Sequence, residues 1–172
     1  MITIITGSRG IGKTTFLLKK STIQTNEVKT LSGILTPPIF DNEGIKIGFS
    51  ALDLSNMKRW ELARTDIKLP GPSYGPFHFS SEGFERANDI IIDALLQGAT
   101  TLFLDEIGPL ELTKNNGFYP CLSHIGRIKD SQDLFIVIRS ELIPVFVKRV
   151  IPGKKYKTIT VNKENRDRLQ LF

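Results

Sequence analysis

A glycine-rich segment near the start of the chain limits the folds that are open to it. Gly7 to Thr14, with the sequence GSRGIGKT, match the P-loop pattern G-x-x-x-x-G-K-[ST]. An apolar, β-branched run at 1–6 predicts a buried strand before the loop, and the run at 14–20 predicts the first turns of a helix after it. Strand, glycine loop and helix in this order form a phosphate cradle, because backbone N–H groups turn inward and the helix N-terminus adds partial positive charge.

Each residue type in this cradle has an expected task. The nucleotide-binding residues that we predict in the loop are Gly7, Ser8, Arg9, Gly10, Ile11, Gly12, Lys13, Thr14 and Thr15. Lys13 is expected to reach the β- and γ-phosphates as a catalytic residue, and the Thr14 hydroxyl to bind Mg²⁺. The Arg9 side chain either contacts the phosphates or points to solvent.

A second motif supplies carboxylates. The run LFLDE at 102–106 predicts an apolar strand followed by two acids, and strand carboxyl ends face the ligand in open α/β sheets. Asp105 is expected to hold Mg²⁺, directly or through water. Glu106 is expected to orient and deprotonate the attacking water as the general base. The alternative is that both acids only cap the turn at 107–109.

Two further residues are candidates for the site. Arg139 directly follows the apolar run at 134–138, so we expect it at the same edge of the sheet, where it would stabilise the transition state; a surface salt bridge is the alternative. The run NKEN at 162–165 resembles the guanine-reading pattern N-K-x-D, with Asn165 in place of the aspartate. Because an amide cannot accept both guanine donors, we expect Asn165 to lie beside the base without strict selection.

Strand and helix signals alternate along most of the chain. Apolar runs predict further strands at 27–36, 100–104, 134–138 and 157–161, the first ended by Pro37-Pro38. Helical spacing predicts one helix capped by Ser80 or Ser81, others at 117–129 and 141–150, and a short polar helix after the last strand.

The middle of the chain has a different pattern. Alternating apolar residues and turn signals in 33–64 predict an antiparallel meander at one edge of the sheet, and prolines and glycines predict a loop at 66–77. Strands that are apolar throughout are typical of parallel sheets covered on both faces. The sequence therefore predicts a three-layer α/β fold with a mainly parallel sheet.

Bulk properties define the class of protein. The 172 residues predict a single domain over 1–172, and a net charge of +5 with scattered basic residues indicates an anionic small ligand rather than nucleic acid, which stays an alternative. The single cysteine, Cys121, excludes an internal disulfide and is expected to be buried. No apolar stretch approaches the roughly 20 residues that span a bilayer. We therefore expect a cytoplasmic monomer without membrane contact.

With these residues in place, the chain resembles the small P-loop nucleoside-triphosphatase family of the cancer-related and thermostable type. The matching segments are Thr6 to Thr15, Ser32-Gly33-Ile34-Leu35-Thr36, Ile47-Gly48-Phe49, Asp105-Glu106-Ile107-Gly108 with Glu111-Leu112, and Lys163-Glu164-Asn165-Arg166. They run in order over nearly the whole chain, and the combination of DEIGxxEL with KENR is more specific than the P-loop. The GPLEL run at 108–112 and the arginine after the late strand indicate one branch of the family.

The resemblance implies a RecA-like fold in which another strand separates the acidic strand from the P-loop strand. It also implies slow, Mg²⁺-dependent hydrolysis of several nucleoside triphosphates, such as ATP and GTP, to diphosphate and phosphate. By matching position, Lys13 and Thr14 would be phosphate and Mg²⁺ ligands, Asp105 a Mg²⁺ partner and Glu106 the general base.

Two other functions fit a P-loop domain. A nucleotide or small-molecule kinase usually has an arginine-bearing lid, whereas Lys68 is the only basic residue in 66–77. A nucleotide-gated binding module would act on a partner, and a salt-sensitive affinity for nucleic acid would favour it.

Overall fold

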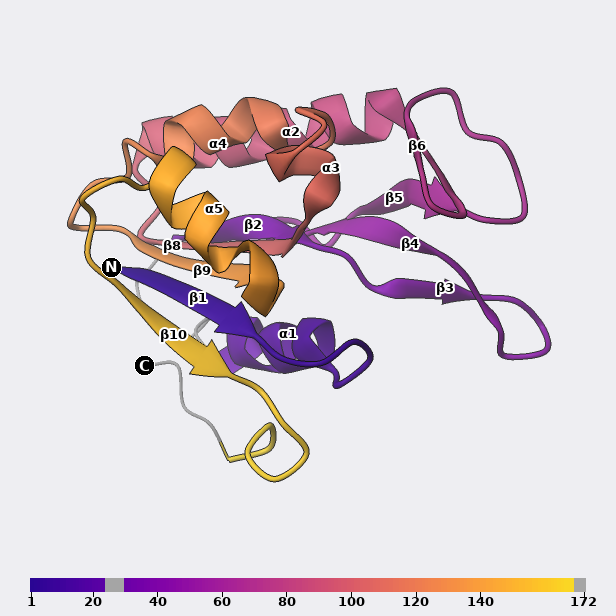
Figure 1. The fold of residues 1–172 in the computed structure, drawn as a ribbon, viewed down its shortest axis with the longest axis horizontal. Helices are drawn as coiled ribbons and strands as arrows, with labels where there is room; N and C mark the ends of the chain where they lie inside the picture. Colours follow the sequence, from indigo (N-terminus) through magenta and orange to yellow (C-terminus); the bar gives the residue numbers. More distant parts are fainter. Residues whose placement is uncertain (24–29, 169–172) are drawn as a thin grey trace.

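The computed structural model describes residues 1–23 and 30–168, which build one mixed sheet with helices on both faces (Figure 1). The strands are β1 (Ile2–Thr6), β2 (Leu31–Leu35), β3 (Pro38–Phe40), β4 (Lys46–Asp53), β5 (Arg59–Arg64), β6 (Ser73–Tyr74), β7 (Phe77–Phe79), β8 (Thr101–Ile107), β9 (Asp133–Ile138) and β10 (Tyr156–Thr160). The helices are α1 (Lys13–Ile23), α2 (Ser81–Gln97), α3 (Pro109–Leu112), α4 (Tyr119–Ile125) and α5 (Ile143–Arg149), with a 3₁₀ turn η2 at Ser140–Leu142.

Five strands in the order β10-β1-β9-β8-β2 are parallel and position the site. β9 lies between β1, which leads into the P-loop, and β8, which carries the two acids. The implied RecA-like strand order is therefore present. Because the five strands are parallel, their carboxyl ends meet at one edge of the sheet, where ligands bind in open α/β folds.

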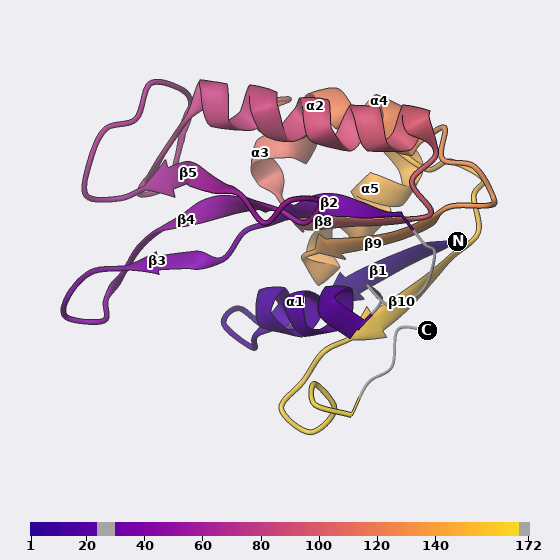
Figure 2. The ribbon, with the colours of Figure 1, turned by 180° about the vertical axis from the view of Figure 1, so that it is seen from behind.

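Alternation along the buried strands sends side chains to both faces of the sheet. On β8, Leu104 packs into the core beneath α2, α4 and α5, whereas Phe103 packs into the core beneath α1, where its ring stacks on Phe135 at 5.0 Å between centroids. The first core is the larger, and Figures 1 and 2 show α1 alone on the opposite face. Two covered faces explain why these strands are apolar throughout. The predicted three-layer α/β fold is confirmed.

An antiparallel meander extends the sheet beyond β2, as the pattern in 33–64 predicted. β4 pairs with β2, β3 and β5, all antiparallel. The prediction of a loop at 66–77 is wrong in part, because β6 and β7 form a hairpin that continues the meander. Phe77 and Phe79 hold it in place by packing against Phe49, with ring centroids 5.1 Å and 5.9 Å apart.

Several element boundaries differ from the sequence expectation. β2 ends at Leu35, one residue before the predicted end at Thr36, and Pro38 begins β3, since an edge strand does not need the missing N–H. Residues 163–168 form turns rather than the predicted polar helix. The part of the predicted strand at 27–29 lies outside the described residues. Cys121 is fully buried, as expected. Among the described residues, no helix is long and apolar enough to cross a membrane.

Ser80 is the N-cap that begins α2, and we expect it to contribute measurably to stability. Its side chain accepts a hydrogen bond from the backbone N–H of Gly83 at 2.9 Å. Ser80→Ala should lower the free energy of unfolding by about 1 kcal/mol, measured by urea denaturation. Ser81→Ala, one residue inside the helix, should change it by less than about 0.5 kcal/mol. Equal losses in the two variants would contradict the assignment of Ser80 as the cap.

Candidate active site

The P-loop joins β1 to α1 at the carboxyl edge of the sheet. Glycine is required at its first position, because φ of Gly7 is +144° and a Cβ there would lie 2.4 Å from the carbonyl oxygen of Val161. The other two glycines of the loop also have positive φ. Ile11 is buried in the core beneath α1, so that only its backbone is available to a ligand. The loop therefore offers backbone groups and a helix N-terminus, as a phosphate site requires.

Lys13 lies folded over the loop. Its Nζ donates hydrogen bonds to the carbonyl oxygens of Gly7 at 2.8 Å and Ser8 at 2.9 Å. Burial lowers the pKa of the Lys13 ammonium below its usual value, and the nearby carboxylates of Glu106 and Asp105 oppose this shift. A phosphate group is a stronger partner for this cation than two carbonyl oxygens, because both members of the pair are then charged.

Asp105 is fully buried at the carboxyl end of β8. Its Oδ2 accepts three hydrogen bonds: from the Thr14 hydroxyl at 2.6 Å, the Thr36 hydroxyl at 3.0 Å and the Thr36 backbone N–H at 3.2 Å. Its Oδ1 has no hydrogen-bond partner among the described residues. Burial raises the pKa of this carboxyl, while the bonds from both threonines act in the opposite direction. An unpartnered buried carboxylate oxygen beside the Thr14 hydroxyl is the donor set that a hard divalent cation binds.

Glu106 lies inside β8 rather than after its end, contrary to the prediction of a strand at 100–104. Leu104 pairs with Ile136 and Ile107 pairs with Ile138, so that β8 carries one residue more than β9 between these pairs. This bulge places Glu106 at φ +63°, a left-handed conformation that is rare for a non-glycine residue. Bulges re-aim side chains next to active sites, and strain of this kind concentrates there.

The surroundings of Glu106 suit a proton acceptor. Its side chain keeps contact with solvent, yet burial and the neighbouring Asp105 carboxylate raise its pKa above the usual value. The cations Lys46, Arg139 and Lys13 oppose this shift, which shows that they lie close enough to act on the carboxylate. A pKa moved toward neutrality makes a carboxylate a better general base.

The alternative that these acids only cap the following turn does not hold. Gly108 is the N-cap of α3, and its backbone N–H donates to Oε2 of Glu111 at 2.8 Å, not to Asp105 or Glu106. Neither acid accepts the N–H that begins α3: Asp105 is bonded to Thr14 and Thr36, and Glu106 is exposed.

The structure brings Arg139 to the site as predicted. It follows β9 directly and begins η2, and its charge influences both Lys13 and Glu106. Three of the other predicted side chains, Ser8, Arg9 and Thr15, are exposed along the loop and the start of α1. Two interpretations of Arg139 were open in the sequence, and this position favours the catalytic one over a surface salt bridge.

The Asn165 side chain is bonded within the turn that follows β10. Its amide oxygen accepts a hydrogen bond from the Asn162 N–H at 2.8 Å, and its amide nitrogen donates to the Thr160 carbonyl at 2.9 Å. Both ends of the amide are therefore oriented by bonds within its own turn. The residue of this turn that reaches the P-loop is Arg166, whose Nη1 donates to the Ile11 carbonyl at 3.5 Å.

Sequence reasoning missed three residues of the site: Thr36, Lys46 and Arg166. Thr36 orients Asp105, and the run SGILT at 32–36 was the only signal for it. Lys46 begins β4, packs its ammonium 5.2 Å from the centroid of the Phe49 ring and acts on Glu106. No local sequence pattern predicts a site role for Lys46, because its charge acts on Glu106 only in the folded chain.

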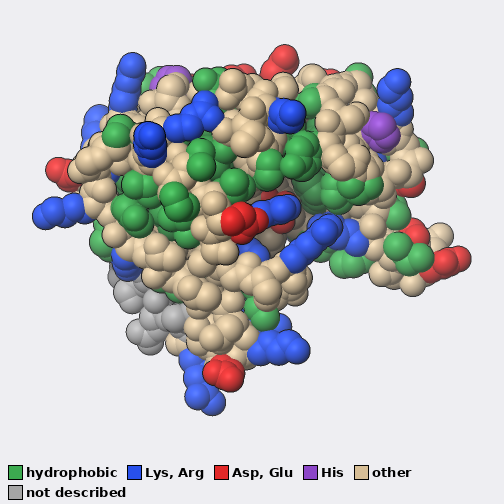
Figure 3. Space-filling model, in the orientation of Figure 1, with side chains coloured by type: hydrophobic (Ala, Val, Ile, Leu, Met, Phe, Trp, Pro, Cys, Tyr) green, Lys and Arg blue, Asp and Glu red, His purple; other side chains and the backbone are tan. Residues whose placement is uncertain are grey.

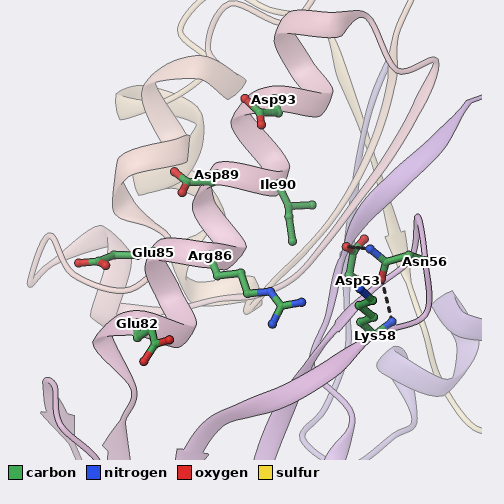
Figure 4. Close-up of a pocket in the computed structure, with 9 residues that line it drawn as sticks. All are labelled: Asp53, Asn56, Lys58, Glu82, Glu85, Arg86, Asp89, Ile90 and Asp93. Atoms are coloured by element: carbon green, nitrogen blue, oxygen red, sulfur yellow. Dashed lines mark hydrogen bonds between the residues drawn. The ribbon is translucent and has the colours of Figure 1, made fainter.

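A separate cavity of about 440 Å³ lies between α2 and the turn after β4 (Figure 4). Acidic side chains of α2 line one wall, and Asp53, Asn56 and Lys58 line the other. Both carboxylate oxygens of Asp53 are hydrogen-bonded within its own turn, because they accept from the side chains of Ser55 at 2.7 Å and Asn56 at 2.8 Å. No residue of the P-loop lines this cavity, so it is not part of the phosphate site.

A phosphate loop that faces a buried carboxylate across one intervening strand defines the class of P-loop nucleoside-triphosphatases. Comparison with known proteins agrees with this class. The model of the family described as NTPase matches residues 2–171, and the chain belongs to this family.

Curated relatives carry the same description. The chain is 32% identical over 168 residues to the nucleoside-triphosphatase THEP1 of Methanopyrus kandleri, covering 96% of this chain and 89% of the relative. It is 29% identical over 167 residues to THEP1 of Thermotoga petrophila, covering 96% and 87%. These alignments span nearly the full length of both proteins, so the likeness is not limited to the P-loop.

Solved structures show the same fold. The crystal structure of THEP1 from Aquifex aeolicus superposes with a TM-score of 0.72 at 24% identity, covering 97% of this chain and 93% of that chain. The solution structure of a human cancer-related nucleoside triphosphatase gives a TM-score of 0.71 at 22% identity, covering 96% and 90%. At these identities the likeness concerns the fold.

Proposed function

We propose that this protein hydrolyses nucleoside triphosphates to diphosphate and phosphate in a Mg²⁺-dependent reaction, as a single P-loop domain with Glu106 as general base. The observation that carries the proposal is the placement of Glu106 beside Lys13, Asp105 and Arg139 by the bulge in β8. A carboxylate there needs no catalytic residue from a partner to activate water.

The buried Asp105 supports the metal requirement. Its unpartnered Oδ1 and the adjacent Thr14 hydroxyl are oxygen donors of the kind that Mg²⁺ prefers. Thr14 and Asp105 would therefore hold the ion, with Thr36 keeping the carboxylate in place. A bound ion would supply positive charge that offsets the charge of the phosphate oxygens.

The residues of the chain divide the remaining work among themselves. Backbone N–H groups of the P-loop bind the phosphates, and Lys13 exchanges its two carbonyl partners for phosphate oxygens. Glu106 holds the attacking water and accepts its proton as the bond to the γ-phosphorus forms. Negative charge then spreads over the equatorial oxygens, where Lys13 and Arg139 stabilise it. At the end of the step Glu106 carries the proton of the water. The diphosphate leaves with the electron pair of the broken bond between the γ-phosphorus and the bridging oxygen.

We further infer a broad base specificity. The candidate base reader, Asn165, is bonded within its own turn, and all interactions described above involve the triphosphate rather than the base. ATP, GTP, CTP and UTP share this triphosphate, so similar turnover is expected with each.

The partner that we propose is the nucleotide alone. Lys and Arg side chains are scattered over the face shown in Figure 3 and along its outline, and acidic and basic side chains meet in a hollow near its middle. This distribution supports a small anionic ligand over nucleic acid. We keep the proposal of a cytoplasmic monomer, and Cys121 is a free, buried thiol.

Phosphate release from ATP, GTP, CTP and UTP, with Mg²⁺ and with chelator, tests the proposed function. Release from all four nucleotides that stops with chelator is the expected result. Nucleotide binding without any release would refute hydrolysis and direct attention to a phosphoryl acceptor, as in a kinase, or to an activating partner. Release from one nucleotide only would refute broad specificity and leave hydrolysis in place.

Asp105→Asn should separate metal binding from folding. A carboxyl whose pKa is raised in the folded state costs stability once the pH exceeds its unfolded value, and Asp105 is such a group. At pH 7 without Mg²⁺, the variant should therefore be as stable as the parent or more so. Its Mg²⁺-dependent turnover should fall about 100-fold. Chelator added to the parent is the matched control, and unchanged Mg²⁺-dependent turnover in Asp105→Asn would contradict the assigned role.

A further inference from the structure

Glu111 is a buried acid that the reaction described above does not use. It is 3% exposed and lies in α3, five residues after Glu106. Its Oε2 accepts the Gly108 N–H at 2.8 Å and its Oε1 accepts the Phe118 N–H at 3.3 Å. The first bond is one half of a capping box, because Gly108 has no side chain to complete the other half; a Glu at this position is ordinarily on the surface, and this one is enclosed.

The chain makes room for this carboxylate. Gly117 has φ +66°, and a Cβ on it would lie 2.2 Å from Oε1 of Glu111. Asn88 of α2 fixes the same segment, because its side chain donates to the Gly117 carbonyl at 2.9 Å and accepts from the Cys121 N–H at 3.2 Å. Glu111 thus links Gly108, which follows β8, to the segment 117–118, which is itself bonded to Asn88 of α2.

The link at Gly108 lies close after the strained residue of the site. Glu106 has φ +63° and is followed by Ile107 and then Gly108, whose N–H is held by Glu111. A strained conformation persists only where the surrounding structure over-determines it. The bulge in β8 fixes Glu106 from one side, and the bond to Gly108 fixes it from the other.

We propose that Glu111 is a positioning residue of the phosphohydrolase reaction, which holds the 106–108 segment so that the Glu106 carboxylate keeps its place beside Lys13 and Arg139. The inference rests on the proposed function of Glu106. It assigns no contact between Glu111 and the nucleotide.

The charge environment of Glu111 is consistent with this role. Burial raises its pKa to about 7, with Glu106 adding to the shift and the Gly108 and Phe118 N–H groups opposing it. The other titratable groups around it are the Cys121 thiol of α4 and, lining the same cavity of about 620 Å³, Tyr119, Arg127 and Arg149. Arg149 is bonded to the Leu112 carbonyl and the Asn115 side chain rather than to Glu111.

This environment predicts opposite effects on stability and turnover. Between the usual pKa of 4.5 and about 7, the folded protein holds a proton on Glu111 that the unfolded chain releases. Stability of the parent should therefore fall as pH rises through this range and level off above it. Glu111→Gln lacks the titration, so at pH 8 its unfolding midpoint should equal or exceed that of the parent. Its kcat should nonetheless fall.

The test combines Glu111→Gln, Gly117→Ala and a control, Gln132→Glu. A Gln at 111 can accept only one of the two N–H bonds, and an Ala at 117 displaces the carboxylate without changing any charge. Gln132 is equally buried at 2% exposure but bonds to Leu95 and Ala99 at the other end of the sheet. We measure kcat and KM with Mg²⁺–ATP, thermal unfolding at pH 5 to 8, and amide hydrogen exchange of the 104–109 peptide.

The expected result is a kcat lowered about 10- to 100-fold in both Glu111→Gln and Gly117→Ala, with KM changed less than about twofold and faster exchange in 104–109. Gln132→Glu should lose stability and keep the kcat of the parent. A parent-like kcat in Glu111→Gln, or unchanged exchange in 104–109, would overturn the inference. A parent that releases no phosphate would refute the proposed function instead, while the exchange measurement still decides whether Glu111 holds the 106–108 segment.

Discussion

Replacing Glu106 by Gln is expected to lower kcat by about 10²- to 10⁴-fold, the range that general base catalysis contributes. Gln keeps the shape and length of the side chain and so preserves the bulge and the positive φ at this position. It cannot accept a proton from water. Binding of Mg²⁺–nucleotide should remain, because the P-loop, Lys13 and Asp105 are untouched.

Phosphate release and nucleotide affinity, measured together on the parent and on Glu106→Gln, check this expectation. Glu85→Gln, which makes the same change on the exposed side of α2, is the matched control and should behave as the parent does. A Glu106→Gln variant that turns over at the rate of the parent would show that another group activates the water. Loss of binding together with turnover would instead show that Glu106 helps to hold the nucleotide.

Lys13→Ala is expected to weaken binding and catalysis together, each by about 10²-fold or more. The Lys13 ammonium donates hydrogen bonds to two carbonyl oxygens of the P-loop. The charges of Glu106 and Asp105 act on it. Its removal deletes a phosphate partner in the ground state and in the transition state. The variant also leaves two carboxylates without their nearest loop cation, which adds repulsion against the triphosphate.

Nucleotide affinity by titration calorimetry and kcat by phosphate release measure the two effects separately. Lys114→Ala removes an equal charge from an exposed position after α3 and controls for the change in net charge. If Lys13→Ala binds nucleotide as tightly as the parent, the assigned phosphate contact is wrong. If Lys114→Ala weakens binding as much, the effect of Lys13 is a general one of net charge.

Much of the site could be predicted from the sequence because it depends on short segments. The P-loop is contiguous, and the local pattern specifies the backbone geometry of its glycines and the positions of Lys13 and Thr14. Asp105 follows from an apolar run that can only be a buried strand, together with the rule that parallel strands share a carboxyl edge. The same runs predicted the three layers and the parallel core of the fold.

Other features could not be predicted, because they depend on contacts between segments far apart in the chain. No local sequence pattern predicts the bulge, in which β8 has one residue more than β9. This bulge gives Glu106 its positive φ. The orientation of the Asn165 amide could not be predicted either, because its turn closes on Thr160, which no motif states. The hairpin of β6 and β7 was hidden by prolines and glycines and is held by aromatic packing on β4.

The sequence by itself determined that this chain has a phosphate cradle, an acidic strand and an apolar sheet covered on both faces, because residue type and spacing act within one element. Only the tertiary structure decided which side chains meet at the edge of that sheet. Thr36 binds Asp105 across 69 residues and Arg166 reaches Ile11 across 155. Such meetings depend on strand register and packing, and these are set by the whole core rather than by any segment of it.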